Sequence, residues 1–259
     1  MEQPSSKLLN LGCGGQWHPA WVNVDMAPAD PSVLAHNLQN PLPFPSESFT
    51  AVYHSHVLEH LPRYRALPFL QECHRVLVNV GIIRVVVPDL ETLAVLYLEN
   101  LRGSLKADKI CQERYEWIVI ELLDQMVRQQ ADGGEMFKYL CQDPIPAWDF
   151  VVQRFGSEVT SKLPQIKNYV KMGTNPKTID QNRPPLTRGK VGEYRLSGEV
   201  HQWMYDRYSL KRLLDAAGFI EAKVVAATES NIPKFQDFNL DIVNGAVRKP
   251  DSLFIEARK

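Results

Sequence analysis

Apolar positions in this chain follow two patterns, short continuous runs near both ends and a helical spacing in the middle. Short apolar runs bounded by turn residues are typical of strands buried on both faces of a sheet. These runs predict core strands at residues 7–12, 21–25, 49–54, 82–87, 219–227 and 252–257. Apolar residues at intervals of three and four predict helices, which cover residues 65–78, most of 90–160 and 209–217.

The order of these elements divides the chain. Strands that alternate with helices imply a parallel, doubly wound sheet. The alternation stops near residue 90 and resumes near residue 200, so we expect a core made of residues 1–90 and 200–259 and a helical insertion at 91–199. The last part of the insertion, residues 173–200, is rich in glycine, proline and charge and is predicted to form an ordered loop or lid.

Composition narrows the class of protein. The 259 residues are 44% hydrophobic and carry a net charge of −1, which suits a globular fold and gives no field to hold nucleic acid. No apolar run reaches the roughly 18 residues of a membrane span, and the start lacks the layout of a signal peptide. The four cysteines have no paired spacing, so we expect a reduced, cytoplasmic protein without a zinc site.

A glycine-rich turn follows the first predicted strand. Its glycines are Gly12, Gly14 and Gly15, and Asp25 ends the next strand thirteen residues after Gly12. Glycine lets the backbone approach a ligand closely, because no Cβ stands in the way. A carboxylate at the end of the second strand can accept hydrogen bonds from both hydroxyls of a ribose. The pattern therefore indicates a cofactor that contains a nucleoside.

The spacing of this turn argues against a dinucleotide. A dinucleotide fingerprint has a third glycine where this chain has Trp17, and its acidic residue follows about 20 residues on. The short interval between Gly12 and Asp25 leaves little room for a helix, whose N-terminus normally holds a pyrophosphate. S-adenosylmethionine contains an adenosine and no phosphate, so it fits the turn better.

The same segments resemble the class I S-adenosylmethionine-dependent methyltransferases. The sequence Leu9-Asn10-Leu11-Gly12-Cys13-Gly14 is similar to the first motif of this family, with Asp25 at the ribose-binding position. Residues 42–49, followed by His56-Val57-Leu58-Glu59-His60, are similar to the fourth-strand region of the small-molecule methyltransferases of type 11. The resemblance implies a Rossmann-like, mostly parallel seven-stranded sheet.

A narrower likeness concerns one branch of this family. Residues 21–25 and 201–210 resemble a branch that is often associated with surface-polysaccharide biosynthesis. The likeness covers roughly residues 7–90 and 200–259 and leaves the insertion unexplained.

The family pattern assigns a set of cofactor-binding residues. These are Asn10, Gly12, Cys13, Gly14, Asp25, Asn37, His54 and Ser55. The chain departs from the pattern at Asn10, where many relatives carry an acid, and at Asn37, where they often carry aspartate. The side-chain carbonyl of Asn37 can still accept a hydrogen bond from an adenine amino group.

Methyl transfer to an oxygen requires a group that removes the acceptor's proton, and histidine suits this task. His56 follows the third core strand and His201 follows the predicted lid, so both are candidates for the general base. His56 and His60 would share a helix face, but no third metal ligand is evident, so we expect no metal. Asp89 and Asp206 are better explained as N-caps of the helices that follow them.

The sequence thus predicts a methyltransferase that acts on an oxygen of a sugar or other small hydroxylated metabolite. The broad apolar surface of the insertion, which includes Trp117, Ile118 and Leu123, either covers the acceptor site or forms a homodimer interface. Basic residues of the lid could recognise a phosphate on the acceptor; they are Lys171, Lys177, Arg183, Arg188, Lys190 and Arg195. The alternative is a non-catalytic module that binds the cofactor and uses the insertion to contact a partner.

Overall fold

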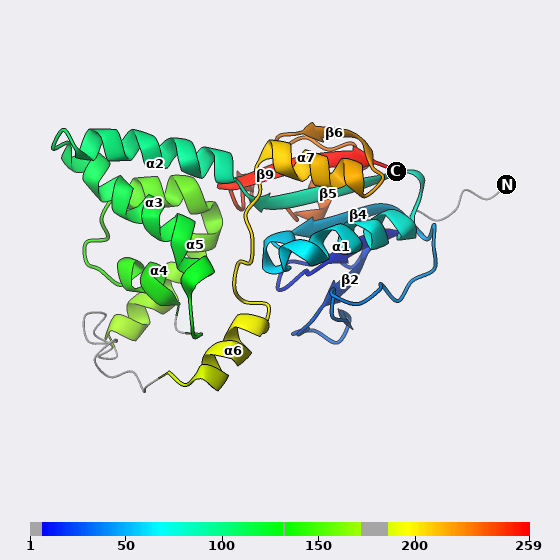
Figure 1. Ribbon diagram of the computed structural model, residues 1–259, viewed down its shortest axis with the longest axis horizontal. Coiled ribbons are helices and arrows are strands. Elements are labelled where there is room, and N and C mark those ends of the chain that lie inside the picture. The colour runs from blue at the N-terminus through cyan, green and yellow to red at the C-terminus, as the bar shows by residue number, and fades with distance from the viewer. Residues whose placement is uncertain (1–6, 132, 172–185) are drawn as a thin grey trace. The chain divides into compact units, whose positions relative to one another are not determined.

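The computed structural model describes residues 7–131, 133–171 and 186–259 (Figure 1). The chain forms two compact units. The sheet unit takes the described parts of residues 1–89, 202–247 and 252–259, and the helical unit takes those of residues 90–201 and 248–251. No helix in the described residues is both long enough and apolar enough to cross a membrane.

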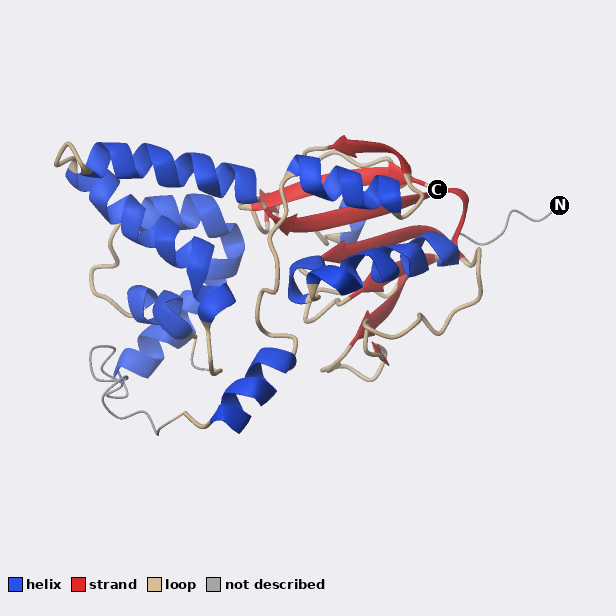
Figure 2. Ribbon diagram, viewed as in Figure 1, coloured by secondary structure: helices blue, strands red, loops and turns tan. Residues whose placement is uncertain are grey.

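The sheet unit contains one seven-stranded sheet in the order β3-β2-β1-β4-β5-β9-β6 (Figure 2). Five neighbouring strands are parallel, and β9 runs antiparallel to both β5 and β6. This order confirms the predicted Rossmann-like, mostly parallel α/β fold. The strands are β1 (Leu8–Leu11), β2 (Trp21–Asp25), β3 (Leu34–Ala35), β4 (Phe49–Ser55), β5 (Leu77–Pro88), β6 (Ile220–Val224) and β9 (Ser252–Arg258).

One face of the sheet is covered by two neighbouring helices, α1 (Arg63–Val76) and α7 (Arg207–Ala216) (Figure 1). Alternate residues of β5 explain this, because side chains of a strand point to opposite faces. Ile83, Val85 and Val87 are buried in the core with α1 and α7. α7 begins at the capping box of Asp206 and Ser209, as the sequence predicts, and Gly218 follows its end with φ of 100°.

The other face of the sheet is covered by the segment between β6 and β9. This segment contains the 3₁₀ helix η3 (Phe235–Phe238) and the short ribbon of β7 (Ile242–Val243) and β8 (Ala246–Val247). Its buried residues Phe235 and Leu240 pack with Trp21 and Tyr53 of the sheet.

A row of polar side chains crosses this second face. Register pairs connect Asn23 with Asn10, Asn10 with Tyr53, Tyr53 with Arg84, and Arg84 with Glu256. All five residues are buried. Because buried polar groups need partners, this row demands a covering segment that supplies hydrogen bonds.

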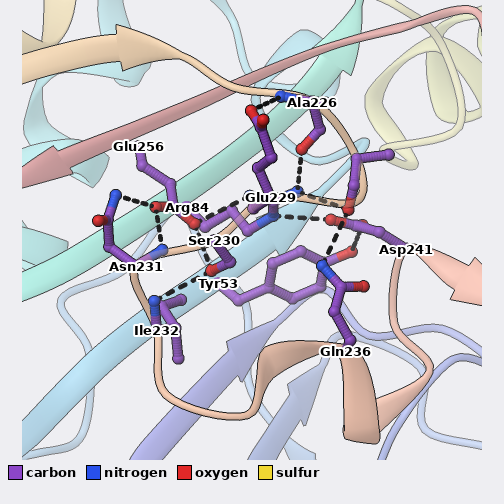
Figure 3. A network of polar contacts seen from close by, with 11 residues as sticks. Tyr53, Arg84, Ala226, Glu229, Ser230, Asn231, Ile232, Gln236, Asp241 and Glu256 are labelled. Carbon is purple, nitrogen blue, oxygen red and sulfur yellow. Dashed lines mark hydrogen bonds and ion pairs between the residues drawn. The ribbon is translucent and has the colours of Figure 1, made fainter.

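Arg84 is the centre of that row (Figure 3). Its Nε donates to Asp241 at 2.7 Å and its Nη1 donates to Glu256 at 2.8 Å. Further guanidinium hydrogen bonds reach the backbone carbonyls of Ala226, Ala227 and Glu229, and the Tyr53 hydroxyl donates to Asp241. The network therefore attaches residues 226–241 to the centre of the sheet.

The helical unit contains α2 (Leu90–Ser104), α3 (Lys109–Val127), α4 (Gly134–Leu140), α5 (Trp148–Lys171) and α6 (Arg188–Leu196). Gly156 interrupts α5 with a φ of 56° and a ψ of −137°. Trp117 and Ile118 are fully buried within this unit, so they cannot contribute to an exposed apolar face, whereas Leu123 is 46% exposed.

Part of the predicted lid is a helix and not a loop. Residues 188–196 form α6, which begins because the Thr187 hydroxyl accepts a hydrogen bond from Lys190 N at 3.3 Å. Lys171 ends α5, and Arg188, Lys190 and Arg195 lie in α6. Lys177 and Arg183 lie outside the described residues.

Candidate functional site

The turn after β1 has the open form that a cofactor needs. Residues 12–20 form turns without a helix, as the short interval predicts. Gly12 and Gly14 adopt positive φ angles of 63° and 51°. A Cβ on Gly12 would collide with Val57, whereas a Cβ on Gly14 would meet no atom within 4 Å. Gly12 is therefore required by both conformation and packing, and open space lies in front of Gly14.

Asp25 ends β2 directly beside this turn. Its Oδ2 accepts a hydrogen bond from Gly14 N at 2.7 Å, and its Oδ1 accepts one from Ala27 N at 2.9 Å. A carboxylate has about four lone-pair sites, so Asp25 keeps capacity for two more donors. The ribose of S-adenosylmethionine supplies two hydroxyl donors, so this cofactor fits the acceptor sites that Asp25 leaves open.

The ends of β1, β3 and β4 converge at the same edge of the sheet. Leu38, after β3, and Val57, after β4, are the side chains nearest to the position of a Cβ on Gly12. Asn37 is exposed, and its Oδ1 accepts a hydrogen bond from Gln39 N at 2.9 Å. Asn37 follows β3 at this edge and its contact with a cofactor stays a prediction, and Leu38 and Val57 are apolar side chains next to Gly12 that motif reasoning missed.

Cys13 lies within the turn with its side chain turned inward. It is 7% exposed, and burial together with the neighbouring charge of Asp25 raises the pKa of its thiol to about 11. The thiol therefore stays protonated at neutral pH and is no nucleophile. We retain Cys13 in the proposed cofactor set through its backbone.

Asn10 is placed behind the turn. It is 1% exposed, and its side-chain nitrogen donates to Gln16 O at 3.1 Å and to Asn23 Oδ1 at 3.0 Å. Both amide hydrogens are therefore used within the protein. The structure favours a role for Asn10 in bracing the turn over the direct cofactor contact that the family pattern suggests.

His54 is also buried where the sequence suggests a ligand contact. Its ring is fully enclosed and lies edge-on to Phe69 of α1, with 5.2 Å between ring centroids. Neither ring nitrogen has a hydrogen-bond partner among the described residues. Burial lowers the pKa of His54 to about 3. The proposed cofactor set therefore omits its ring, whereas Ser55, the last residue of β4, stays in the set.

The buried ring of His54 predicts a specific acid sensitivity. Below pH 6.5 the unfolded chain protonates this histidine while the folded chain does not, until the pH approaches 3. The free energy of unfolding should therefore fall as the pH is lowered through this window, by at most about 1.4 kcal/mol per pH unit. His54→Leu should remove this contribution without a loss of stability at pH 7.

Urea unfolding between pH 7 and 4 measures this effect, with His74→Leu as the comparison because burial lowers the pKa of the half-buried His74 less strongly. Parallel stability curves for His54→Leu and the unmodified protein would show that His54 takes up its proton in the folded state.

His56 is held between two side chains at the end of β4. Its Nδ1 lies 3.1 Å from Glu59 Oε1, and its Nε2 lies 2.8 Å from Ser252 Oγ. The backbone has a positive φ of 55°, and His56 N donates to Val86 O at 2.9 Å. A left-handed backbone is uncommon outside glycine and is strained, so it persists here because the hydrogen bond to β5 and the contacts of the ring hold it. Such strained positions often belong to functional sites.

Glu59 belongs to the 3₁₀ helix η1 (Leu58–His60), which the sequence predicts as a helical turn. Its carboxylate is fully buried, and its backbone carbonyl accepts hydrogen bonds from Gln202 N at 2.6 Å and Trp203 N at 3.2 Å. These two hydrogen bonds fix residues 202–203 beside η1. The three-residue spacing from His56 could have revealed Glu59 as its partner, whereas no sequence signal points to Ser252.

The end of β5 meets the segment before α7 close to Glu59. Asp89, which directly precedes α2, forms an isolated parallel bridge with Tyr205. Tyr205 is 3% exposed, and burial together with the charge of Glu59 raises the pKa of its hydroxyl to about 12. Tyr205 is therefore a neutral phenol at neutral pH.

His201, the second predicted base, belongs to the helical unit. It is 7% exposed, and its backbone nitrogen donates to Gln125 O at 3.2 Å. Its catalytic role stays a prediction.

Comparisons with known proteins give one family match and a set of remote structural neighbours. Residues 20–85 match a family described as a methyltransferase domain. No curated protein matches the chain. Similar solved structures include a SAM-dependent methyltransferase from Archaeoglobus fulgidus, at 14% identity over 98% of this chain and 86% of that chain, with a TM-score of 0.40.

Two further solved structures are similarly remote. A possible histamine N-methyltransferase from Thermotoga maritima has 12% identity over 100% of this chain and 84% of that chain, with a TM-score of 0.40. A putative methyltransferase from Bacillus halodurans has 13% identity over 99% and 93%, with a TM-score of 0.38. The family match at residues 20–85 lies within the sheet unit, and the chain is similar to S-adenosylmethionine-dependent methyltransferases.

Proposed function

We propose that the protein transfers a methyl group to an oxygen of a sugar or other small hydroxylated metabolite. The observation that carries this proposal is the ring of His56, held between the buried carboxylate of Glu59 and the hydroxyl of Ser252. Oxygen acceptors need a proton acceptor more than amines do, because a hydroxyl must lose its proton during attack. His56 lies after β4, at the carboxyl edge where ligands bind in such sheets.

Each residue of the site would have a separate task. The turn of Gly12 and Gly14, the carboxylate of Asp25 and the loop of Asn37 would hold the cofactor. S-adenosylmethionine, when bound there, supplies an activated methyl group. The protein then has to align the acceptor oxygen and exclude competing water.

The geometry around His56 defines the proton transfer. Glu59 lies at Nδ1 and favours the tautomer that carries its hydrogen there, which leaves a lone pair at Nε2. Nε2 would accept the proton of the acceptor hydroxyl, and the buried Glu59 carboxylate would stabilise the resulting imidazolium. Ser252 Oγ lies 2.8 Å from Nε2, so the acceptor hydroxyl would have to replace this hydrogen bond to deliver its proton.

The sugar class of acceptor rests on the resemblance of residues 21–25 and 201–210 to a polysaccharide-associated branch. The basic side chains of α6 would suit a phosphate on such an acceptor. A cytoplasmic location is part of the proposal, since all four cysteines are free thiols. A homodimer through the helical unit is a further proposal, for which Leu123 offers exposed apolar surface.

The test is the release of S-adenosylhomocysteine from S-adenosylmethionine over a panel of monosaccharides, nucleotide-linked sugars, phenols and amines. We expect release with hydroxylated acceptors. Release with amines alone would contradict oxygen transfer. Cofactor binding without release in any arm would favour the non-catalytic module.

A further inference from the structure

A groove with a basic and aromatic lining lies between α1 and α7, outside the cofactor turn. It has a volume of about 270 Å³, and its lining includes Arg63, Trp203, Tyr205, Tyr208 and Arg212. All five residues belong to the sheet unit. None of them is part of the cofactor set or contacts His56, although Trp203 N donates to the carbonyl of Glu59, so the groove adjoins the candidate site and has no assigned role in it.

The two arginines of the groove are held by rings and not by carboxylates. The Arg63 guanidinium carbon lies 4.6 Å from the centroid of the Trp203 ring, and that of Arg212 lies 5.6 Å from the centroid of the Tyr208 ring. Within the described ranges, the structure gives neither arginine an ion pair with a carboxylate. Each guanidinium keeps donors that an anion could use.

The start of α1 adds to this positive potential, whereas the Asp206 carboxylate caps the start of α7. α1 begins with Arg63 and has no acidic residue in its first turn. The N-cap of α1 is Pro62, which supplies no side-chain acceptor for the first backbone N–H groups. Cations at a helix N-terminus oppose the helix dipole, so a bound anion would stabilise this arrangement.

The exposed aromatic rings indicate that the bound anion carries a ring of its own. Trp203 is 38% exposed and Tyr208 is 69% exposed, so both rings keep surface that their arginines leave open. Flat apolar surface beside the two guanidiniums that line the groove suits a compound in which a phosphate is joined to a sugar or base ring. The volume of the groove suits a single such unit and not a polymer.

We propose that this groove is a binding site for a phosphorylated ring compound, with the phosphate between Arg63 and Arg212 and the ring against Trp203 or Tyr208. Sugar phosphates and nucleotides share this chemistry. The site does not depend on the proposed acceptor, because binding here requires no methyl transfer.

Calorimetric titration of the full chain with uridine monophosphate, glucose 1-phosphate, inorganic phosphate, uridine and glucose tests the proposal. We expect both phosphorylated ring compounds to bind more tightly than phosphate alone or either unphosphorylated compound. Saturating S-adenosylhomocysteine should leave this binding unchanged. The stronger of the two phosphorylated probes tells nucleotide from sugar phosphate.

Arg212→Gln should weaken this binding at least about tenfold, because a charge-assisted hydrogen bond to phosphate is lost. Lys211→Gln is the matched control, since Lys211 is an exposed cation on the same helix and does not line the groove. Arg63→Gln is a second variant on the other helix. Circular dichroism confirms that each variant is folded.

Three results would overturn the site: no heat with any phosphorylated probe at millimolar concentration, equal affinity in both arginine variants and the unmodified protein, or binding of a polyglutamate peptide in place of the phosphorylated compounds. Because the readout is binding without cofactor turnover, such a failure would leave the proposed methyl transfer intact.

Discussion

Arg84→Leu is expected to lower the free energy of unfolding by about 3–5 kcal/mol. The substitution leaves the carboxylates of Asp241 and Glu256 buried without their shared cation, and both are within 3% of full burial. It also removes the guanidinium hydrogen bonds to the carbonyls of Ala226, Ala227 and Glu229. Urea unfolding at pH 7 measures the loss.

The effect should extend to the cofactor turn. Gln16 Nε2 donates to Asn239 O at 2.7 Å, and Asn239 lies in the segment that Arg84 attaches to the sheet. We therefore expect weaker binding of S-adenosylhomocysteine in Arg84→Leu, even where the variant is folded.

Arg258→Leu is the matched control for this prediction. Arg258 lies on β9 and pairs with Glu221 at 3.4 Å, but these side chains are 40% and 60% exposed. An exposed pair contributes about 0–1 kcal/mol, so this variant should be nearly as stable as the unmodified protein. A loss of equal size in the two variants would contradict the importance of the buried network.

His56→Ala is expected to lower kcat for a hydroxylated acceptor by about 10²–10⁴-fold, the usual contribution of a general base. The affinity for S-adenosylhomocysteine should change little, because His56 is outside the turn of Gly12 and Gly14. Glu59→Gln should reduce kcat less, since it keeps the ring's neighbour in place but removes the charge that stabilises the imidazolium.

Initial rates across a pH series separate a base from a structural residue. The unmodified enzyme should gain activity as the pH rises, and His56→Ala should lack this rise. His74→Ala is the control histidine, since its ring packs edge-on against Phe219. An unchanged kcat in His56→Ala would mean that alignment alone suffices or that another group accepts the proton.

Local patterns account for what the sequence predicted well. Continuous apolar runs predicted the strands β1, β2 and β5, because a strand buried on both faces needs apolar residues throughout. The missing helix between Gly12 and Asp25 followed from chain length alone. The capping box of Asp206 and Ser209 was predictable because its partners are three residues apart.

Contacts between distant segments could not be predicted from one sequence. Arg84 and Asp241 are 157 positions apart, and His56 and Ser252 are 196 positions apart. No local spacing encodes such pairs, because they depend on strand order and register. The same register buries Asn10 and His54, which a motif alone had suggested as ligand contacts.

Calorimetric titration with S-adenosylhomocysteine tests the central claim that Asp25 and the adjacent glycine turn hold the cofactor. Asp30→Ala is the control, since Asp30 is an acid of the same region whose Oδ1 accepts hydrogen bonds from Ser32. We predict that Asp25→Ala raises the Kd by about 10²–10³-fold, because two hydrogen bonds to a charged group are lost, while Asp30→Ala binds normally. Equal affinity in Asp25→Ala and the unmodified protein would contradict the account.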